Sequence, residues 1–356
     1  MLNSPQELLM SEPTVAPSKD SSEAEIAESE RTERPGMSTS AGAVLKNFRG
    51  FGGALAALLI MVLYLSVTQE FFFTKANILN VLSGNSALMI TAIGLTFVVL
   101  SAGFDLSVGA IYAAAGYVAY RALESGLPEI VALLLGGLTG VLLGGAVNGV
   151  LIGRIRLNFF VVTLGTTSLF TGALNVVTNG KTNTIPIEEG SLLYALGNGT
   201  VMTIPVPVVL SLTVLLLSGY LLRFTSFGRA VYAVGGNPEA ARLAGINVSW
   251  VYVCVYGLGG LFASVAGMVD ASRLASASPT AGASLALTAG AAVLLGGTSF
   301  YGGLGGVFGT VVGVLLIAVL QNGLGLMGVS AFWQGVVTGT VLVVAVLLDK
   351  LQSRST

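Results

Sequence analysis

Apolar runs separated by short polar breaks fill the chain from residue 50 almost to its end. Their lengths approach the ~20 residues that a helix needs to cross the ~30 Å hydrocarbon core of a bilayer. We assign them to residues 50–68, 77–100, 104–122, 129–152, 158–178, 204–222, 249–270, 281–298, 304–326 and 329–348. The pattern predicts an all-α polytopic membrane protein with about ten transmembrane helices.

Two glycine-rich stretches interrupt this pattern, near residues 101–109 and 296–306. Irregular backbone at membrane depth survives only where it is buried in protein or lines a cavity. We therefore expect broken or re-entrant segments at both places. At the second, a re-entrant element is an alternative to full crossings at 281–298 and 304–326.

Asp105 lies in the first break, between Gly103 and Gly109 and two residues before Ser107. A carboxylate here can cap the next helix by accepting hydrogen bonds from the amides of Leu106 and Ser107. Ionisable groups at membrane depth are rare and are often functional. Asp105 is thus either a helix cap or, together with the break, part of a gate.

The composition agrees with a membrane protein: 54% of the residues are hydrophobic and only 9% are charged, against ~25% in soluble domains. Ion-coupled carriers usually need ionisable groups at depth. This chain has no histidine, and besides Arg121 and Glu129 at span ends we place only Asp105 and Asp270 within the spans. The driving energy is therefore expected from another subunit, and the net charge of −1 argues against nucleic-acid binding.

Residues 1–45 are rich in Ser, Glu, Pro and Thr. Such a segment cannot bury enough apolar surface to fold, so we expect a disordered cytoplasmic tail followed by a permease domain at 46–350. Of 16 Lys and Arg residues, all but Lys75, Arg121, Lys181 and Arg273 fall on the side of the N-terminus. The positive-inside rule then predicts that both termini are cytoplasmic.

The loop at residues 223–248 falls on the same, cytoplasmic side and is polar, basic and rich in glycine. Asn237 is a good N-cap, and Pro238 suits the first turn of a helix. Glu239 follows where the helix dipole favours a carboxylate, and Gly245 is a typical helix stop. The loop is predicted to hold a short capped surface helix, which is either a contact site or a plain connector.

Glu239-Ala240-Ala241, followed after three residues by Gly245, resembles the EAA-x3-G signature of membrane subunits of ATP-binding-cassette (ABC) importers. In that family the short helix docks into a groove of a separate ATPase subunit. The resemblance implies that small residues here let the partner approach the helix backbone. The residues assigned to this coupling contact are Asn237, Pro238, Glu239, Ala240, Ala241, Arg242 and Gly245.

Further blocks resemble the sugar-type permeases of these importers, the ribose, galactose and xylose group that includes the autoinducer-2 permeases. The blocks are LTFVVLSAGFDLSVGAI, LNFFVVTLGTTSLFTG, ASPTAGASLALTAGAAVLLGGTSFYGGLGGVFGT and LQNGLGLMGVSAFWQGVV. The chain departs from the family at Ala286 and Thr288, where a Glu and an Asp are common, and at Ala102, where a Gly is usual.

This resemblance implies a multi-pass protein of the bacterial cytoplasmic membrane that imports a monosaccharide or related polyol. The expected partners are an ABC ATPase that holds ATP and Mg²⁺, a second permease copy or paralogue, an extracytoplasmic sugar-binding protein and membrane lipid. The chain itself is expected to be no enzyme and to bind no cofactor or metal. Gly180-Lys181-Thr182 resembles the end of a phosphate loop, but Asn175 stands where such a loop needs glycine.

Sugars are held by amide and hydroxyl hydrogen bonds and by aromatic stacking. The candidates for the translocation path or gate are Asn85, Gly103, Asp105, Ser107, Phe159, Thr163, Asn175, Gln321, Asn322 and Trp333. The alternative for each polar member is a hydrogen bond between helices. Two alternative functions are a branched-chain amino-acid ABC permease and a secondary carrier or channel that works alone.

Glycines spaced four apart form stripes along several spans. They are Gly136, Gly140 and Gly144; Gly145, Gly149 and Gly153; Gly305, Gly309 and Gly313; and Gly335 and Gly339. Such stripes let helix backbones pack closely. They indicate either a dimer contact or packing within one subunit.

Overall fold

The computed structural model describes residues 40–330, 332–337, 339–340 and 343. Two compact units divide the chain at Lys46 and Asn47. Residues 1–39, most of the segment predicted to be a disordered tail, lie outside the described residues. Residues 40–45, which that prediction included, form the start of a helix.

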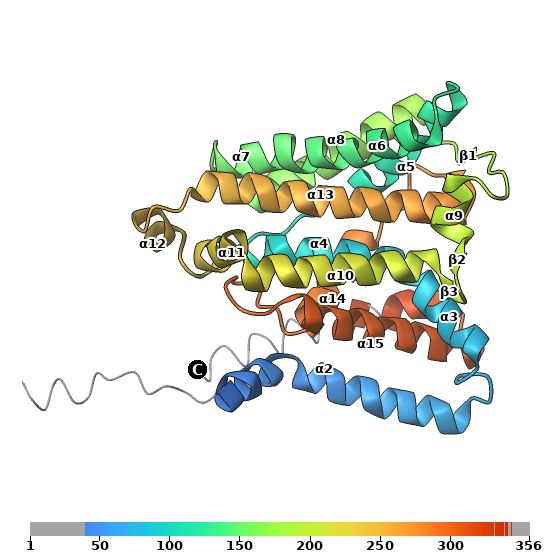
Figure 1. The fold of residues 1–356 in the computed structure, drawn as a ribbon, viewed down its shortest axis with the longest axis horizontal. Coiled ribbons are helices and arrows are strands. Elements are labelled where there is room, and N and C mark those ends of the chain that lie inside the picture. Colours follow the sequence, from blue (N-terminus) through green and yellow to red (C-terminus); the bar gives the residue numbers. More distant parts are fainter. Residues whose placement is uncertain (1–39, 331, 338, 341–342, 344–356) are drawn as a thin grey trace, which may run out of the picture. The chain divides into compact units, whose positions relative to one another are not determined.

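Helices make up most of the described chain (Figure 1). They are α2 (Ser40–Thr68), α3 (Lys75–Gly84), α4 (Ser86–Leu100), α5 (Val108–Glu124), α6 (Glu129–Gly140), the π-helix η1 (Val141–Gly149), α7 (Val150–Gly153), α8 (Phe159–Thr178), α9 (Leu192–Asn198), α10 (Val206–Phe224), α11 (Ser226–Gly236), α12 (Pro238–Leu243), α13 (Val248–Arg273), α14 (Leu285–Leu295) and α15 (Val307–Leu326). Short antiparallel pairs join β1 (Asn183–Thr184) to β4 (Ser276–Ala277) and β2 (Thr200–Val201) to β3 (Ile204–Pro205).

Within the described residues, 6 helices are long and apolar enough to cross a membrane. The pair α3 and α4, bent by 44° at Asn85, raises this number to 7 if it is one span. The protein is thus polytopic, whereas the total of about ten crossings stays a prediction. Its last segment, 329–348, lies partly outside the described residues.

α14 explains part of the difference between the ten predicted crossings and the 6 or 7 candidate spans among the described residues. It has 11 residues, which at 1.5 Å per residue span about 16 Å, only about half of the hydrocarbon core. The apolar run at 281–298 is therefore not one continuous crossing helix, in agreement with the re-entrant alternative. Both predicted breaks are present, at residues 101–107 between α4 and α5 and at 296–306 between α14 and α15.

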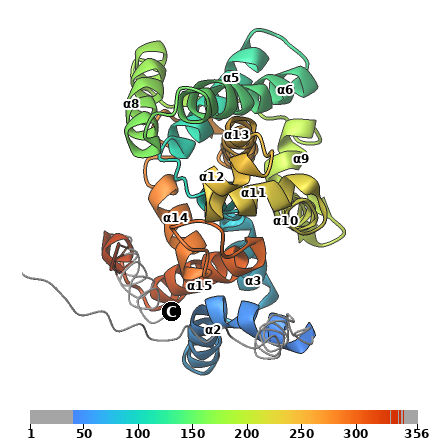
Figure 2. The same cartoon turned by 90° about the vertical axis from the view of Figure 1, so that its left-hand side faces the viewer.

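The glycine stripes of α6, η1 and α7 pack against α13 within this chain. Figure 2 shows α5 and α6 above α13. A methyl group at Gly140 would overlap the carbonyl oxygen of Gly260, and one at Gly144 would overlap that of Tyr256. These close contacts remove much apolar surface between two membrane helices. For these two stripes the structure agrees with packing inside one subunit. Gly335 and Gly339, by contrast, have no described atom within 4 Å of the position of an added Cβ.

Candidate coupling and translocation site

The predicted surface helix is present as α12, and both of its ends are capped. The Asn237 side-chain oxygen accepts hydrogen bonds from the amides of Glu239 and Ala240, each at 3.0 Å. At the other end Gly245 has φ +83°, and its amide donates to the Arg242 carbonyl at 3.0 Å. The Ile246 amide donates to the Ala241 carbonyl at 3.0 Å, which completes a Schellman motif. These caps fix the conformation of a helix that is otherwise too short to be stable.

One face of α12 is turned inward and the rest is open. Ala241 is only 4% exposed and packs with the hydrophobic core, so its side chain faces its own chain. The other residues predicted to contact the ATPase, from Asn237 to Gly245, are exposed. Glu239 forms an ion pair with Arg242 on this open surface.

Leu243 is 87% exposed at the end of α12, and sequence reasoning missed it. Its signal was the one large aliphatic side chain in the short helix Pro238–Leu243. An apolar side chain of this size leaves considerable free energy to be gained when a partner covers it. Leu243 therefore joins the candidate coupling residues.

Basic residues gather at the end of the bundle that carries α12. Arg154 and Arg156 follow α7, Arg223 lies in the last turn of α10, and Arg229 lies on α11. Figure 1 shows the C-terminal ends of α7 and α10 at the same end of the bundle as α11 and α12. These four arginines are among the basic residues from which the cytoplasmic side was predicted.

A cavity of about 500 Å³ lies at this same end. Its walls include Gly103 of the first break, Phe159 at the start of α8, Glu239 and Arg242 of α12, and Tyr252 of α13. Two residues predicted for the path, Gly103 and Phe159, thus share one cavity with α12. The volume is within the range of small-molecule sites in proteins.

Asp105 and Ser107 belong to a buried polar cluster beyond this cavity. Asp105 is fully buried, and its Oδ1 accepts hydrogen bonds from the Ser107 amide at 2.8 Å and the Ser107 hydroxyl at 2.6 Å. α5 begins at the next residue, Val108. The predicted capping role of Asp105 is therefore confirmed for the Ser107 amide.

Asn148 on η1 completes the cluster and was not predicted. Its Nδ2 donates to the Ser107 hydroxyl at 2.7 Å, and the side chain is fully buried. Asn148 Oδ1 and Asp105 Oδ2 have no hydrogen-bond partner among the described residues. A lone amide in the apolar run from Val141 to Gly153 was the signal, and π-helical turns occur often at functional sites.

The other path candidates do not join these residues. Asn85 caps the bend between α3 and α4, where its Nδ2 donates to the Val81 carbonyl at 2.8 Å. Thr163 is buried in α8, and Trp333 is 63% exposed. Asn175 is half-buried near the end of α8, and Gln321 and Asn322 are half-buried on α15. The set predicted as one path is therefore distributed over several parts of the bundle.

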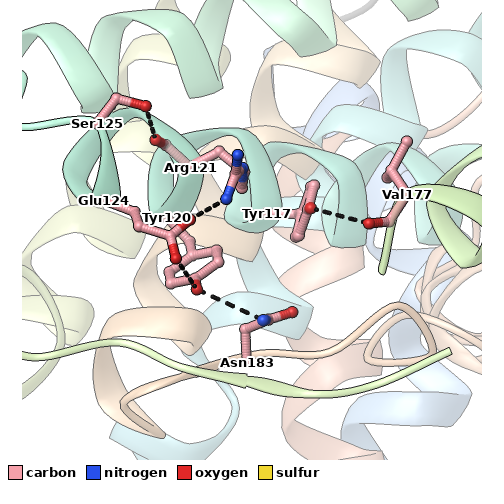
Figure 3. Close-up of polar contacts among 7 residues, drawn as sticks. All are labelled: Tyr117, Tyr120, Arg121, Glu124, Ser125, Val177 and Asn183. Atoms are coloured by element: carbon pink, nitrogen blue, oxygen red, sulfur yellow. Dashed lines mark hydrogen bonds and ion pairs between the residues drawn. The ribbon is translucent and has the colours of Figure 1, made fainter. Parts of the chain in front are cut away.

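The opposite end of the bundle carries a second polar surface (Figure 3). Tyr120 on α5 donates to Glu124 Oε1 at 3.0 Å and accepts from Asn183 Nδ2 at 3.4 Å. Glu124 also pairs with Arg121, and Tyr117 donates to the Val177 carbonyl at 3.4 Å. These bonds join α5 to the end of α8 and to the segment that begins with β1.

α9 is anchored at this end as well. The amide of Leu193 donates to Glu129 Oε2 at 2.9 Å, and the Ser272 hydroxyl donates to the Leu193 carbonyl at 2.5 Å. Leu193 and Ile185 are buried with Tyr120 in a small core. The segment at 179–203 is thus folded onto α6 and α13.

The structure also shows what occupies the two positions where the sugar-type family commonly has acids. Ala286 is buried against Val108 and Ile111. Thr288 uses its hydroxyl to donate to the Ser284 carbonyl at 3.0 Å. An apolar contact and a helix-backbone hydrogen bond thus stand in place of two carboxylates.

These features define a permease component of a transport system. The family described as "Branched-chain amino acid transport system / permease component" matches residues 77–346, and the chain belongs to it. The ribose import permease protein of Haemophilus influenzae is 41% identical over 294 residues, which is 82% of this chain and 91% of that protein. The ribose import permease protein of Bacillus subtilis is 42% identical over 302 residues, or 85% and 93%. The D-allose transport system permease protein of Escherichia coli is 35% identical over 314 residues, or 85% and 92%.

No solved structure matches the chain. The predicted resemblance to permeases of ABC sugar importers is confirmed by these relatives. The protein is a multi-pass membrane component of this class.

Proposed function

We propose that this chain is the membrane subunit of an ATP-driven importer and forms part of the path by which a monosaccharide enters the cell. The observation that carries the proposal is α12. It is a helix capped at both ends, exposed at the end of a membrane bundle, and it carries the EAA-x3-G pattern.

α12 is the proposed contact for a separate ATPase, which would hold ATP and Mg²⁺. A helix whose two ends are fixed by hydrogen bonds can transmit a displacement without unwinding. Glu239, Arg242 and Leu243 offer the partner an ion pair and an apolar anchor. The basic residues at this end support a cytoplasmic orientation. Ten crossings would then leave both chain termini in the cytoplasm.

The path is proposed to lead to the cavity beside α12. The first break supplies irregular backbone at membrane depth, which is stable where protein covers it or where it lines a cavity. A second permease copy or a paralogue would complete the path. A sugar-binding protein would dock at the opposite end, where the cluster around Tyr120 and the helix α9 hold the surface in one conformation.

A pentose or hexose is the proposed solute, because relatives of the chain are named as permeases for ribose, D-allose and xylose. The family description names branched-chain amino acids instead. The solute assay must therefore include both classes.

The test is uptake of radiolabelled ribose, allose, xylose and leucine by cells with and without the gene for this chain. We expect the deletion to abolish vanadate-sensitive uptake of one sugar and to leave leucine uptake unchanged. Loss of leucine uptake alone would favour the branched-chain alternative. Transport by the purified chain in liposomes, with no ATPase present, would contradict the proposal and favour a carrier or channel.

A further inference from the structure

The C-terminal end of α11 packs directly on the end of α4. A methyl group at Gly235 would overlap the carbonyl oxygen of Leu100, the last residue of α4. The same carbonyl accepts a hydrogen bond from the Gly303 amide at 2.9 Å. α11, α4 and the second break therefore meet around one backbone oxygen atom.

Tyr232 provides a second link one turn earlier on α11. Its hydroxyl donates to the Gly305 carbonyl at 2.9 Å. Gly302, Gly303 and Gly305 all have positive φ, of 82°, 71° and 114°. These conformations suit glycine, and they place the backbone of this loop against α11.

The two breaks also touch each other. The rings of Phe104 in the first break and Phe300 in the second lie 6.0 Å apart between centroids. Tyr256 on α13 donates to the Phe104 carbonyl at 3.4 Å. A displacement of one break is thus opposed by contacts with the other.

α12 is connected to this assembly through α11. Asn237 alone separates the two helices in the chain, its side chain caps α12, and its amide donates to the Ala233 carbonyl of α11 at 3.0 Å. Between α12 and Gly103, by contrast, lies the 500 Å³ cavity. A packed connection from α12 to both breaks therefore runs through α11.

We propose that α11 transmits the movement of α12 to both breaks, with Tyr232 and Gly235 as the positioning residues of this junction. The inference rests on the proposed coupling role of α12. It adds that ATP-driven movement reaches the path through main-chain contacts at Leu100, Gly303 and Gly305. Packed elements with two discrete arrangements are the physical means by which such coupling is carried.

The test uses the complete importer in proteoliposomes and measures sugar transported per ATP hydrolysed. Tyr232→Phe removes the hydrogen bond and keeps the ring, and we expect the ratio to fall by about fivefold, the factor that corresponds to one net hydrogen bond. Gly235→Ala, which forces α11 away from Leu100, should lower it at least as much. The controls are Tyr220→Phe on the exposed side of α10 and Gly236→Ala, whose added Cβ meets no described atom within 4 Å.

A spin label separates coupling from folding. Leu304 is 69% exposed in the second break, and Cys254 is the single cysteine of the chain, so Leu304→Cys in a Cys254→Ser background accepts one label. Addition of ATP, Mg²⁺ and vanadate should change the spectrum of the label in the parent protein, and Tyr232→Phe should suppress that change. ATPase co-purification should stay at the parent value in Tyr232→Phe, and its unfolding temperature should fall by no more than a few degrees, the effect of one lost hydrogen bond.

An unchanged transport ratio and an unchanged spectral response in Tyr232→Phe would overturn the inference while the proposed function stood. If the Gly235→Ala variant is not inserted into the membrane, the Tyr232→Phe variant still tests the inference. Failure of the ATPase to bind the parent protein would instead contradict the proposed function.

Discussion

Asn77 on α3 and Asn322 on α15 exchange two side-chain hydrogen bonds, at 3.1 and 2.8 Å. Asn77 Nδ2 also donates to the Phe72 carbonyl at 2.9 Å. The amide of Asn322, predicted as a possible path residue, is thus engaged by a neighbouring helix. This pair corresponds to the alternative in which polar residues join helices.

Asn322→Ala should therefore destabilise the protein without changing its solute affinity. Hydrogen bonds between membrane helices contribute ~0.6 kcal/mol on average and up to ~1.7 kcal/mol. A double-mutant cycle with Asn77→Ala, measured by unfolding in mixed micelles, should give a coupling energy in this range. Additive effects of the two substitutions would contradict the pairing.

Asp105 allows a cap to be distinguished from a charge that acts in transport. Asp105→Ala removes the acceptor of the Ser107 amide and hydroxyl, and the loss of a cap costs about 0.5–2 kcal/mol. Asp105→Asn keeps an oxygen at the capping position and should stay close to the parent protein in thermal unfolding. If Asp105→Asn is stable but no longer supports uptake, the charge itself serves transport.

Gly140 should tolerate no side chain. Gly140→Ala drives a methyl group into the Gly260 carbonyl and the Ser264 hydroxyl, and overpacking of this kind costs about 1–3 kcal/mol. Gly137→Ala is the matched control on the same helix, because its added Cβ would lie 3.8 Å from Leu261 Cδ1, an ordinary contact. We expect a lower unfolding temperature only for Gly140→Ala. Equal temperatures for both variants would show that α6 and α13 do not pack as described.

Leu243→Asp should weaken ATPase binding. Burial of a leucine contributes about 1.5–3 kcal/mol, so the dissociation constant should rise by about tenfold or more. Leu243→Met should bind nearly as well as the parent protein. Leu274→Asp is the control, since Leu274 is also exposed but ends α13 at the far side of the bundle. The measurement is biolayer interferometry with the permease in nanodiscs, and unchanged binding by Leu243→Asp would remove this residue from the contact.

The ends of α12 could be predicted from the sequence because cap chemistry is local. Asn237 satisfies amides two and three residues later, and Gly245 supplies a backbone conformation that most residues avoid. The inward orientation of Ala241 could not be predicted in the same way. It depends on how the helix lies against the core, which its own six residues do not encode.

The apolar runs predicted where helices lie, but they did not predict which helices cross the membrane. Hydropathy treats an alanine that faces lipid and one that is buried by protein alike, and Ala289 and Ala292 of α14 are fully buried. The partners of Ser107 and Gly140 were equally hidden. Asn148 lies 41 residues after Ser107, and Gly260 lies 120 residues after Gly140, so only the folded bundle brings them together.

The junction of α11 with the two breaks consists largely of backbone carbonyls, amides and glycines. None of these groups distinguishes one solute from another. On the proposed route through α11, an importer adapted to a different nutrient can thus alter its recognition surfaces while this junction stays the same. Redesign of specificity should accordingly leave the stretch from Tyr232 to Gly235 and the loop from Gly302 to Gly305 untouched.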